Sequence, residues 1–444
     1  MTENHIGRKL RRGQKAGAVA GMALYALVFG AAAGAIVWAF LRVLGLGIDF
    51  IWATLPQWFD GGAVYTAAVC IGGGAVIGLF QRRFGIWPDT MEEVMGKLKR
   101  DGTYPWRRLH IILIAVLMPL LFGGTLGPEA GLTGIITALC CMTGDALKYK
   151  TAELRELAEA GMAATLGVIF NAPFFGFVNN FEHSRAEEKR WFSPREFRLS
   201  RAVVYAAGIA GGFATLGMLR HLFGGGLGLP RLKMDDAVHG LIGLNDWKWF
   251  PVYAGCGLLL GLFYLVFSKL TSSLAGLLAE RRVLCCMIAG ACLALLGIWN
   301  PLNMFSGEAQ LTELAASWQT IPVTALVLTA ITKLLATNIC LSFGWKGGSI
   351  FPIIYCGVSL GFGLAALTGG LPIFAVAVSA AATYGYIVKK PLTVVAILFL
   401  CFPLRLFIPL AAAAYLGSLI PSPWVRKKAD GGKKRRLFRR KHRQ

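Results

Sequence analysis

Residues 123–129 read GGTLGPE, and they separate an apolar segment at 109–123 from another at 128–147. Pro128 suits the first turn of a helix, where no backbone N–H is needed, and the glycines before it let the backbone approach an ion closely. A second break, GWKGGSIFP at 344–352, also leads into an apolar segment. The two breaks therefore predict two helices that begin within apolar surroundings.

The composition predicts that these helices lie in a bilayer. Of the 444 residues, 56% are apolar and only 15% are charged, and the mean hydropathy is +0.59. These values are too apolar for an ordinary soluble protein. The first apolar stretch, at 17–41, is too long for a signal-peptide core and is expected to remain as a membrane helix. The ten cysteines lack histidine or acidic neighbours at ligand spacing, so neither a metal nor a cofactor is expected.

Much of the net charge of +22 lies at the ends of the chain. Eleven basic residues stand between Arg426 and Arg443, opposed only by Asp430. By the positive-inside rule both termini are predicted to lie in the cytoplasm, with the protein in the cell inner (plasma) membrane. A solvated tail that sets topology and meets lipid headgroups is favoured over a specific lipid or nucleic-acid site.

Apolar segments suited to helices recur along the whole chain. They run at 17–44, 61–81, 109–123, 128–147, 160–182, 201–223, 250–270, 283–299, 320–341, 350–368, 372–388 and 391–420. Several are shorter than the roughly 20 residues of a perpendicular span, so tilted and partial helices are expected. The predicted division is a basic cytoplasmic N-terminus at 1–16, a first membrane repeat at 17–223, a connector at 224–249, a second repeat at 250–425 and a basic cytoplasmic tail at 426–444.

The two halves of the chain contain matching breaks rich in glycine and proline. After the first break and its helix comes Asn171-Ala172-Pro173, and after the second comes Lys389-Lys390-Pro391. Such an internal repeat is typical of transporters and predicts a binding site where the breaks meet at mid-membrane. A helix that starts there presents unpaired N–H groups and the positive end of its dipole, which bind anions. Two helix starts aimed at one point would form a chloride-sized site.

Glu129 is the most informative residue of the first break. It stands at a predicted helix start, and the nearest acidic residue before it is Asp101. A lone carboxylate within a membrane is costly, which makes it a functional hypothesis by default. The charged side chain could occupy the anion site and leave it when protonated or displaced. The alternative is an acid near the membrane surface that merely complements the helix dipole.

These segments resemble the CLC family of chloride channels and chloride–proton antiporters. The GPEA sequence at 127–130 is similar to the motif that holds the family's gating glutamate, and residues 170–176 (FNAPFFG) resemble its Phe-Asn-Ala-Pro segment. Residues 333–352 resemble its lysine-led helix and Gly-Gly-x-Phe-x-Pro motif. The resemblance implies an all-α polytopic membrane protein with a CLC-type inverted repeat, whose broken and tilted helices meet at mid-membrane. It also implies a homodimer, a gate at Glu129, and anion contacts near Gly127, Glu129, Ala130, Ser349, Ile350 and Phe351.

The sequence departs from the family pattern at three places. Residues 85–88 (GIWP) are the best counterpart of its Gly-Ser-Gly-Ile-Pro motif, so the anion-contacting serine is missing, and the expected tyrosine falls at Trp424 or Val425. The family's inner proton-transfer glutamate aligns with His183, which is next to Glu182. These two residues form the candidate proton path, and the alternative is that His183 is a surface histidine.

One further candidate is Lys333, for which two interpretations stay open. In the first, the lysine snorkels or pairs with a carbonyl, and in the second it raises the positive potential of the pathway.

The predicted function is transport of chloride or a similar small inorganic anion, either passively or in exchange for protons. Because the serine and tyrosine are absent, selectivity for fluoride, nitrate or bicarbonate is the first alternative. A non-transporting membrane scaffold is the alternative from another class. An enzyme is not expected, because the sequence contains no paired acids, HExxH or Gly-x-Ser-x-Gly arrangement within a helix.

Overall fold

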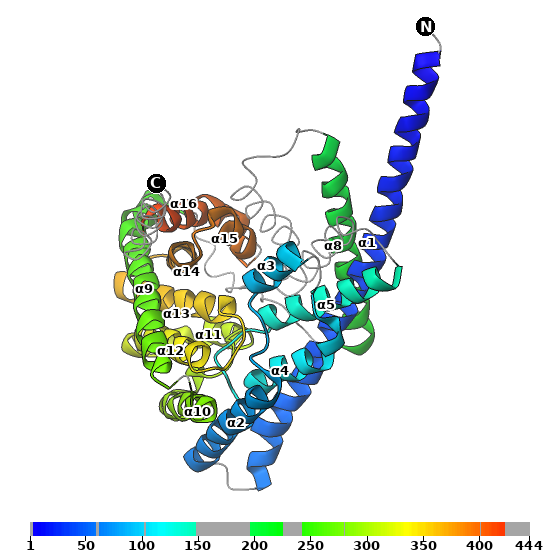
Figure 1. Cartoon of the computed structure of the whole chain (residues 1–444). Helices are drawn as coiled ribbons and strands as arrows, with labels where there is room; N and C mark the ends of the chain where they lie inside the picture. Colours follow the sequence, from blue (N-terminus) through cyan, green and yellow to red (C-terminus); the bar gives the residue numbers. More distant parts are fainter. Residues whose placement is uncertain are drawn as a thin grey trace, which may run out of the picture.

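The computed structural model describes residues 3–58, 62–101, 104–147, 196–224, 242–278, 280–399 and 401–421. In these ranges the regular structure is helical, as the composition predicts (Figure 1). The first half contains α1 (Glu3–Asp49), α2 (Ala63–Phe84), α3 (Met91–Asp101), α4 (Leu109–Leu121), α5 (Glu129–Leu147) and α8 (Glu196–Phe223). The second half contains α9 (Leu244–Gly276), α10 (Arg282–Trp299), α11 (Gln310–Ser317), α12 (Val323–Ser342), α13 (Ile350–Thr368), α14 (Pro372–Val388), α15 (Pro391–Leu398) and α16 (Phe407–Leu419).

Seven helices in the described part of the chain are long and apolar enough to cross a membrane. The first runs from Ala20 in α1 to Trp58 in the helical turns that follow, and the others lie within α2, α8, α9, α10, α12 and α13. By contrast, α4 has 13 residues, α15 has 8 and α16 has 13, too few for a perpendicular crossing. The chain is therefore a multi-pass membrane protein that combines full spans with partial helices, which confirms the predicted architecture.

The helix boundaries follow the apolar pattern closely in some places and differ from it in others. The observed α13 and α14 coincide with the predicted segments at 350–368 and 372–388. The prediction of one continuous segment at 391–420 was wrong, because α15 ends at Leu398 and α16 begins at Phe407. Pro403 lies between them, and a proline lacks the N–H that a continuing helix requires.

Helix also occurs outside the predicted apolar segments. The amphipathic α3 lies between the segments predicted at 61–81 and 109–123 and is not among the candidate spans. The α9 helix begins at Leu244, before the predicted repeat boundary at 250. The predicted segment at 160–182, the Asn171-Ala172-Pro173 sequence and the basic tail at 426–444 lie outside the described residues.

Two helices form the centre of the second half. Every residue of α13 from Phe351 to Ala365 is buried, and so is every residue of α14 from Ile373 to Tyr386. Around them pack α9, α12 and α16, and Figure 1 shows α13 and α14 within this group. A helix that is apolar on all sides is expected at such a position, because neighbouring helices cover its whole circumference.

Glycines let the outer helices approach each other closely. The helices α1 and α8 run side by side (Figure 1). A Cβ atom on Gly34 of α1 would lie 2.5 Å from the carbonyl oxygen of Gly212 on α8, and one on Gly30 would collide with Gly208. Small residues spaced by four on both helices are typical of such membrane contacts.

Replacing Gly34 with leucine should separate α1 from α8. The new side chain has no room at the crossing, and overpacking of this kind costs roughly 1–3 kcal/mol. Thermal unfolding in detergent should therefore show a lower Tm for Gly34→Leu. The matched control is Gly45→Leu on the same helix, where a Cβ meets nothing within 4 Å. Equal melting temperatures for the two variants would contradict the close crossing.

Candidate functional site

The two glycine-rich breaks meet and join each other through their backbones. The N–H of Gly127 donates to the carbonyl of Gly348 at 2.8 Å, and the N–H of Gly348 donates to the carbonyl of Gly127 at 2.8 Å. Because α5 begins at Glu129 and α13 at Ile350, this bridge brings the starts of both helices to one point. The two helix starts predicted from the repeated breaks therefore lie close together.

The breaks are equivalent residue by residue. Glu129 and Ile350 are 221 residues apart, and the bridged glycines have the same separation. In each break a glycine in the left-handed region follows the preceding helix, at φ 85° for Gly123 and 103° for Gly344. The next N–H then returns to a carbonyl of that helix at 2.8 Å in both cases. Each incoming helix is thus closed by a Schellman-type turn before the chain enters the site.

The equivalence corrects one detail of the sequence interpretation. Pro128 does not lie in the first turn of α5 but just before it, and its carbonyl accepts the N–H of Leu132 at 3.0 Å. Ser349 has the same place before α13, where its carbonyl accepts the N–H of Ile353 at 3.1 Å. Pro352 is instead the third residue of α13. The prolines are therefore displaced in register, although both stand where a helix needs no N–H.

The Glu129 carboxylate lies at the start of α13. Only 3% of the residue is exposed, and its Oε1 accepts a hydrogen bond from the N–H of Ile350 at 2.9 Å. Its Oε2 is buried without a hydrogen-bond partner among the described residues. A carboxylate thus occupies the place where the positive end of a helix favours an anion.

Both bridged residues must be glycine for this arrangement to exist. A Cβ on Gly127 would collide with the Glu129 Oε2, and a Cβ on Gly348 would collide with Oε1. The two glycines therefore form the walls against which the carboxylate lies. Any side chain at either position would push the carboxylate out of the site.

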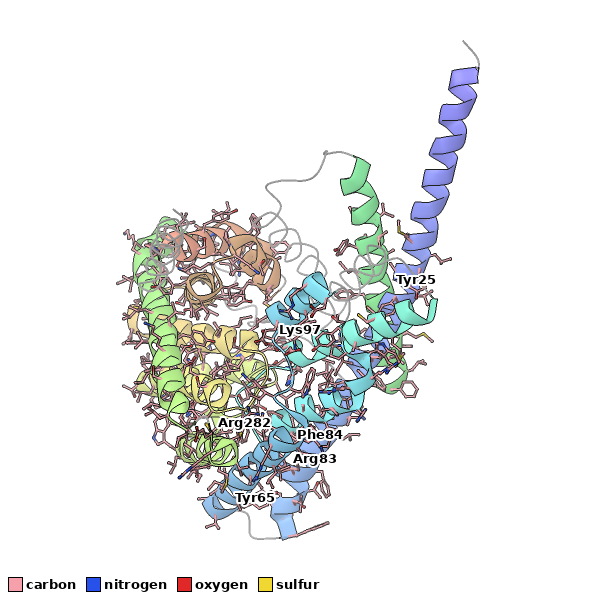
Figure 2. All side chains as sticks on the ribbon, viewed as in Figure 1. Tyr25, Tyr65, Arg83, Phe84, Lys97 and Arg282 are labelled. Carbon is pink, nitrogen blue, oxygen red and sulfur yellow. The ribbon has the colours of Figure 1, made fainter. Side chains whose placement is uncertain are left out.

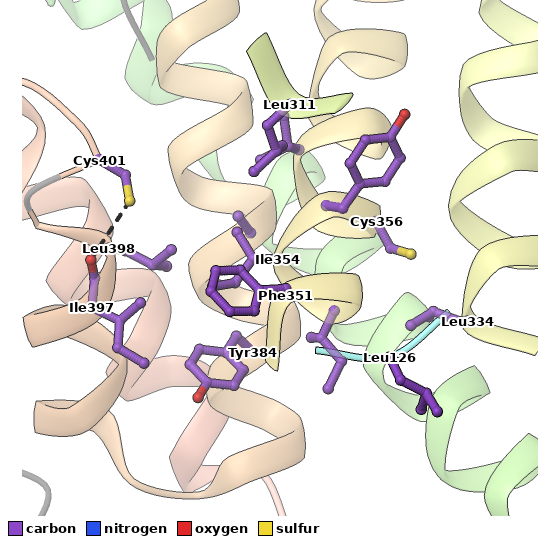
Figure 3. Packing of buried hydrophobic residues seen from close by; sticks show 14 of the residues in the cluster. Leu126, Leu311, Leu334, Phe351, Ile354, Cys356, Tyr384, Ile397, Leu398 and Cys401 are labelled. Atoms are coloured by element: carbon purple, nitrogen blue, oxygen red, sulfur yellow. Dashed lines mark hydrogen bonds between the residues drawn. The ribbon is translucent and has the colours of Figure 1, made fainter. Parts of the chain in front are cut away.

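The remaining predicted anion contacts lie in the first turns of α5 and α13 or directly before α13. Ala130 and Phe351 are buried, whereas Ser349 and Ile350 are partly exposed. Figure 3 shows the Phe351 ring beside Tyr384 and Ile354. One side of the site is therefore closed by packed side chains, and the other side is less covered.

Two tyrosines near the site were missed by the sequence analysis. The hydroxyl of Tyr264 on α9 is hydrogen-bonded with the side chain of Ser349, and Tyr384 on α14 lies within range of the charge of Glu129. Both residues stand in apolar segments, where an aromatic residue is normally part of the core. No local sequence signal distinguishes them, since their role depends on which helices pack around the breaks.

Lys333 pairs with carbonyls, which is the first of its two predicted alternatives. The residue is fully buried on α12. Its Nζ donates to the carbonyl of Leu302 at 2.5 Å, to that of Met304 at 2.9 Å and to the Oε1 of Gln310 at 3.1 Å. The ammonium also lies 4.6 Å from the ring centre of Tyr355. Its charge is thus directed at the segment 302–310.

That segment supports the first break directly. The N–H of Phe305 donates to the carbonyl of Gly123 at 3.0 Å, and the Thr125 hydroxyl donates to the carbonyl of Asn303 at 2.5 Å. Lys333 therefore positions the backbone that leads to Glu129. The segment also carries Glu308, a partly exposed acid whose charge reaches Glu129.

Some predicted residues cannot be placed. Glu182 and His183 of the candidate proton path, and Trp424 and Val425 at the expected tyrosine, lie outside the described residues. In the part of the chain that the structure describes, no group of three or more His, Cys, Asp or Glu side chains is arranged to hold a metal ion.

The comparison with protein families decides the family of this chain. The family profile described as voltage gated chloride channel matches residues 73–422. The chain belongs to this family. It is therefore an anion-transport protein of the CLC type.

Known relatives and structures agree with the family. The YfeO protein of Salmonella choleraesuis (strain SC-B67), an ion-transport protein by name, is 27% identical over 367 residues, which cover 79% of this chain and 82% of that protein. A slow cyanobacterial Cl⁻/H⁺ antiporter has a similar fold, with a TM-score of 0.70 and 18% identity over 89% of this chain and 94% of that chain. A CLC-type fluoride/proton antiporter gives a TM-score of 0.68 and 19% identity over 90% and 95% of the two chains.

Replacing Gly348 with alanine should displace the Glu129 carboxylate from the N–H of Ile350. A hydrogen bond to a charged group contributes roughly 1.5–3 kcal/mol, so anion flux at neutral pH should rise by roughly tenfold or more. Flux from liposomes containing the purified protein measures this effect. Gly134→Ala on α5 is the matched control, because its Cβ would meet no atom closer than 3.5 Å. Unchanged flux in a folded Gly348→Ala protein would contradict the geometry.

Proposed function

We propose that the protein conducts chloride through the point where α5 and α13 begin, and that Glu129 is the gate. One observation carries this proposal: the Glu129 Oε1 accepts the N–H of Ile350 at 2.9 Å, at the start of a buried helix. The carboxylate and a small inorganic anion need the same N–H groups. They therefore compete for one place.

The chemistry of the gate follows from this competition. A charged Glu129 fills the site and blocks it, because the dipole and the N–H groups of α13 favour the carboxylate. Protonation removes the charge and most of that attraction, so the side chain leaves and an anion can bind. Bound anions are held by backbone groups rather than by a fixed cation, which permits fast release.

We propose that transport is coupled to protons. The buried Oε2 of Glu129 has no hydrogen-bond partner among the described residues, so it is available to accept a proton. Two structures of similar fold are a chloride/proton and a fluoride/proton antiporter, which supports this mode. Glu182 and His183 stay the predicted proton path, and Glu308 is a second acid close enough to act on Glu129.

The choice of anion rests on the hydroxyls near the site. Ser349 and Tyr264 form a hydroxyl pair beside the N–H of Ile350, and they could take the part of the missing serine and tyrosine. Neutral hydroxyl donors suit chloride. Fluoride is the second candidate, because one of the structures of similar fold is a fluoride/proton antiporter.

The assembly and location complete the proposal. We expect a homodimer in the cell inner (plasma) membrane, with both termini in the cytoplasm and the basic tail near acidic lipid headgroups. Exposed apolar residues on α16, such as Phe407, Ile408 and Leu419, offer an apolar surface for a partner subunit or for lipid. We propose transport without an enzymatic activity.

Replacing Glu129 with glutamine or alanine should leave anion flux and abolish proton movement. Neither variant has a carboxyl group that can titrate at this position, so flux should also lose its dependence on pH. Anion and proton fluxes from liposomes measure both effects. Glu313→Gln, which alters an exposed acid on α11, should behave as the wild type. Persisting pH dependence in Glu129→Ala would overturn the gate.

A chloride gradient across liposomes should drive protons uphill in the wild-type protein. Exchange through one shared site requires this coupling, whereas a passive pathway would move chloride with no proton flux. A pH-sensitive dye records the proton movement, and repeating the assay with fluoride, nitrate and bicarbonate ranks the anions. Chloride flux without proton movement would show that the protein is a passive channel. Absence of all flux from folded protein would favour the scaffold alternative.

A further inference from the structure

The second break is open to solvent on one side. Lys346, Gly347, Ser349 and Ile350 are each partly exposed, whereas Glu129 is buried. An anion that reaches the N–H of Ile350 can therefore approach along this part of the break. Lys346 lies three residues before Ser349 and supplies a positive charge along this path.

The backbone around Lys346 is fixed from several directions. The Gln81 Nε2 donates to the carbonyl of Gly344 at 2.5 Å. The buried Trp345 donates through its Nε1 to the carbonyl of Cys286 at 2.9 Å. After Lys346, the chain joins the bridge of the two breaks. The lysine side chain thus extends from an immobile point beside the site.

More cations stand at the same end of the fold. The helices α2 and α10 pack together, with Gly78 of α2 against Val283 of α10. Figure 2 shows Arg83 and Arg282 at this end, where the last turn of α2 and the first turn of α10 lie. Cys286 on α10 lies within range of the charges of both Arg282 and Lys346. Four exposed arginines flank this end of the two helices: Arg82, Arg83, Arg281 and Arg282.

An acid on the surface helix α3 opposes Lys346. The N–H of Thr90 donates to the Oε2 of Glu93 at 2.8 Å, and the N–H of Glu93 donates to the Thr90 hydroxyl at 3.3 Å, which is a capping box. The hydrogen bond from Thr90 holds the pKa of Glu93 below its usual value, so the group is charged at neutral pH. Its charge lies within range of Lys346 and of Lys97.

Lys346 has fewer attachments than Lys97. Lys97 is already bound to Asp89 at 2.5 Å. The α3 helix is held on α5, because the buried Val94 lies against Gly134. Glu93 is therefore a fixed negative charge within range of a lysine for which the structure gives no salt bridge in the described residues.

We propose that Lys346 forms a recruitment site for small inorganic anions at the open side of the second break, and that Glu93 competes with the anion for this lysine. An anion at the recruitment site would pass next to Ser349 and the N–H of Ile350. The inference rests on the proposed anion pathway and adds the side from which anions enter that pathway. It also gives α3 a role, because the negative charge of Glu93 on this helix weakens the binding of anions to Lys346.

The test measures how chloride flux depends on chloride concentration in liposomes of neutral lipid. Lys346→Gln should raise the half-saturating concentration by roughly two- to fivefold, the size of a partly exposed charge interaction, with little change in maximal flux. Glu93→Gln should lower it by a similar factor, and glutamine keeps the capping box intact. In the double variant the effect of Glu93→Gln should vanish, because its target is gone.

The control is Lys248→Gln, which removes one exposed positive charge near the beginning of α9. The start of α10 follows the opposite end of that helix. It should leave the concentration dependence unchanged. An unshifted half-saturating concentration in folded Lys346→Gln, or an equal effect of Glu93→Gln with and without Lys346, would overturn the recruitment site while the gate stands. A shift that appears only with acidic lipids would also overturn it and assign Lys346 to headgroups. Absence of wild-type flux would overturn the proposed function together with this site.

Discussion

The structure depends on one backbone interaction, the pair of hydrogen bonds between Gly127 and Gly348. Neither break has a regular partner within its own half, because each follows a finished helix and precedes a new one. Exposed backbone in a bilayer costs several kcal/mol for each unsatisfied group. Pairing the breaks with each other satisfies both and, by the same contact, aims two helix starts at one place. The same two hydrogen bonds therefore contribute both to stability and to function.

Lys333 shows how a buried charge can serve this geometry without contacting an anion. A lone ammonium within a membrane is expensive, and three oxygens and the Tyr355 ring compensate for it. The segment that receives those bonds then holds Gly123 and Thr125 of the first break. The lysine thus fixes the position of Glu129 through two layers of hydrogen bonds. We infer that its role is positioning.

Much of this arrangement could be predicted from the sequence, and the missing parts have a common physical cause. The two breaks and Glu129 were predicted because glycine, proline and a lone acid within apolar runs are strong local signals, whereas the anion contacts near Gly127 and Ser349 came from the resemblance to the CLC family. Tyr264 and Tyr384 were not predicted, since an aromatic residue in an apolar helix has no sequence feature that reveals what it faces. The Lys333 partners were also hidden, because they come from backbone carbonyls. Local chemistry is readable from sequence, whereas contacts between distant helices require the fold.

The carboxylate at the start of α13 makes the protein carry its own tethered competitor. Attachment through a short side chain gives a competing group an effective concentration on the order of millimolar or higher. A free anion must match that concentration, so the apparent affinity of the intact site is weaker than the intrinsic affinity of the bare helix start. A strongly attractive site can thereby still release its ion quickly, because the tethered carboxylate is ready to take its place.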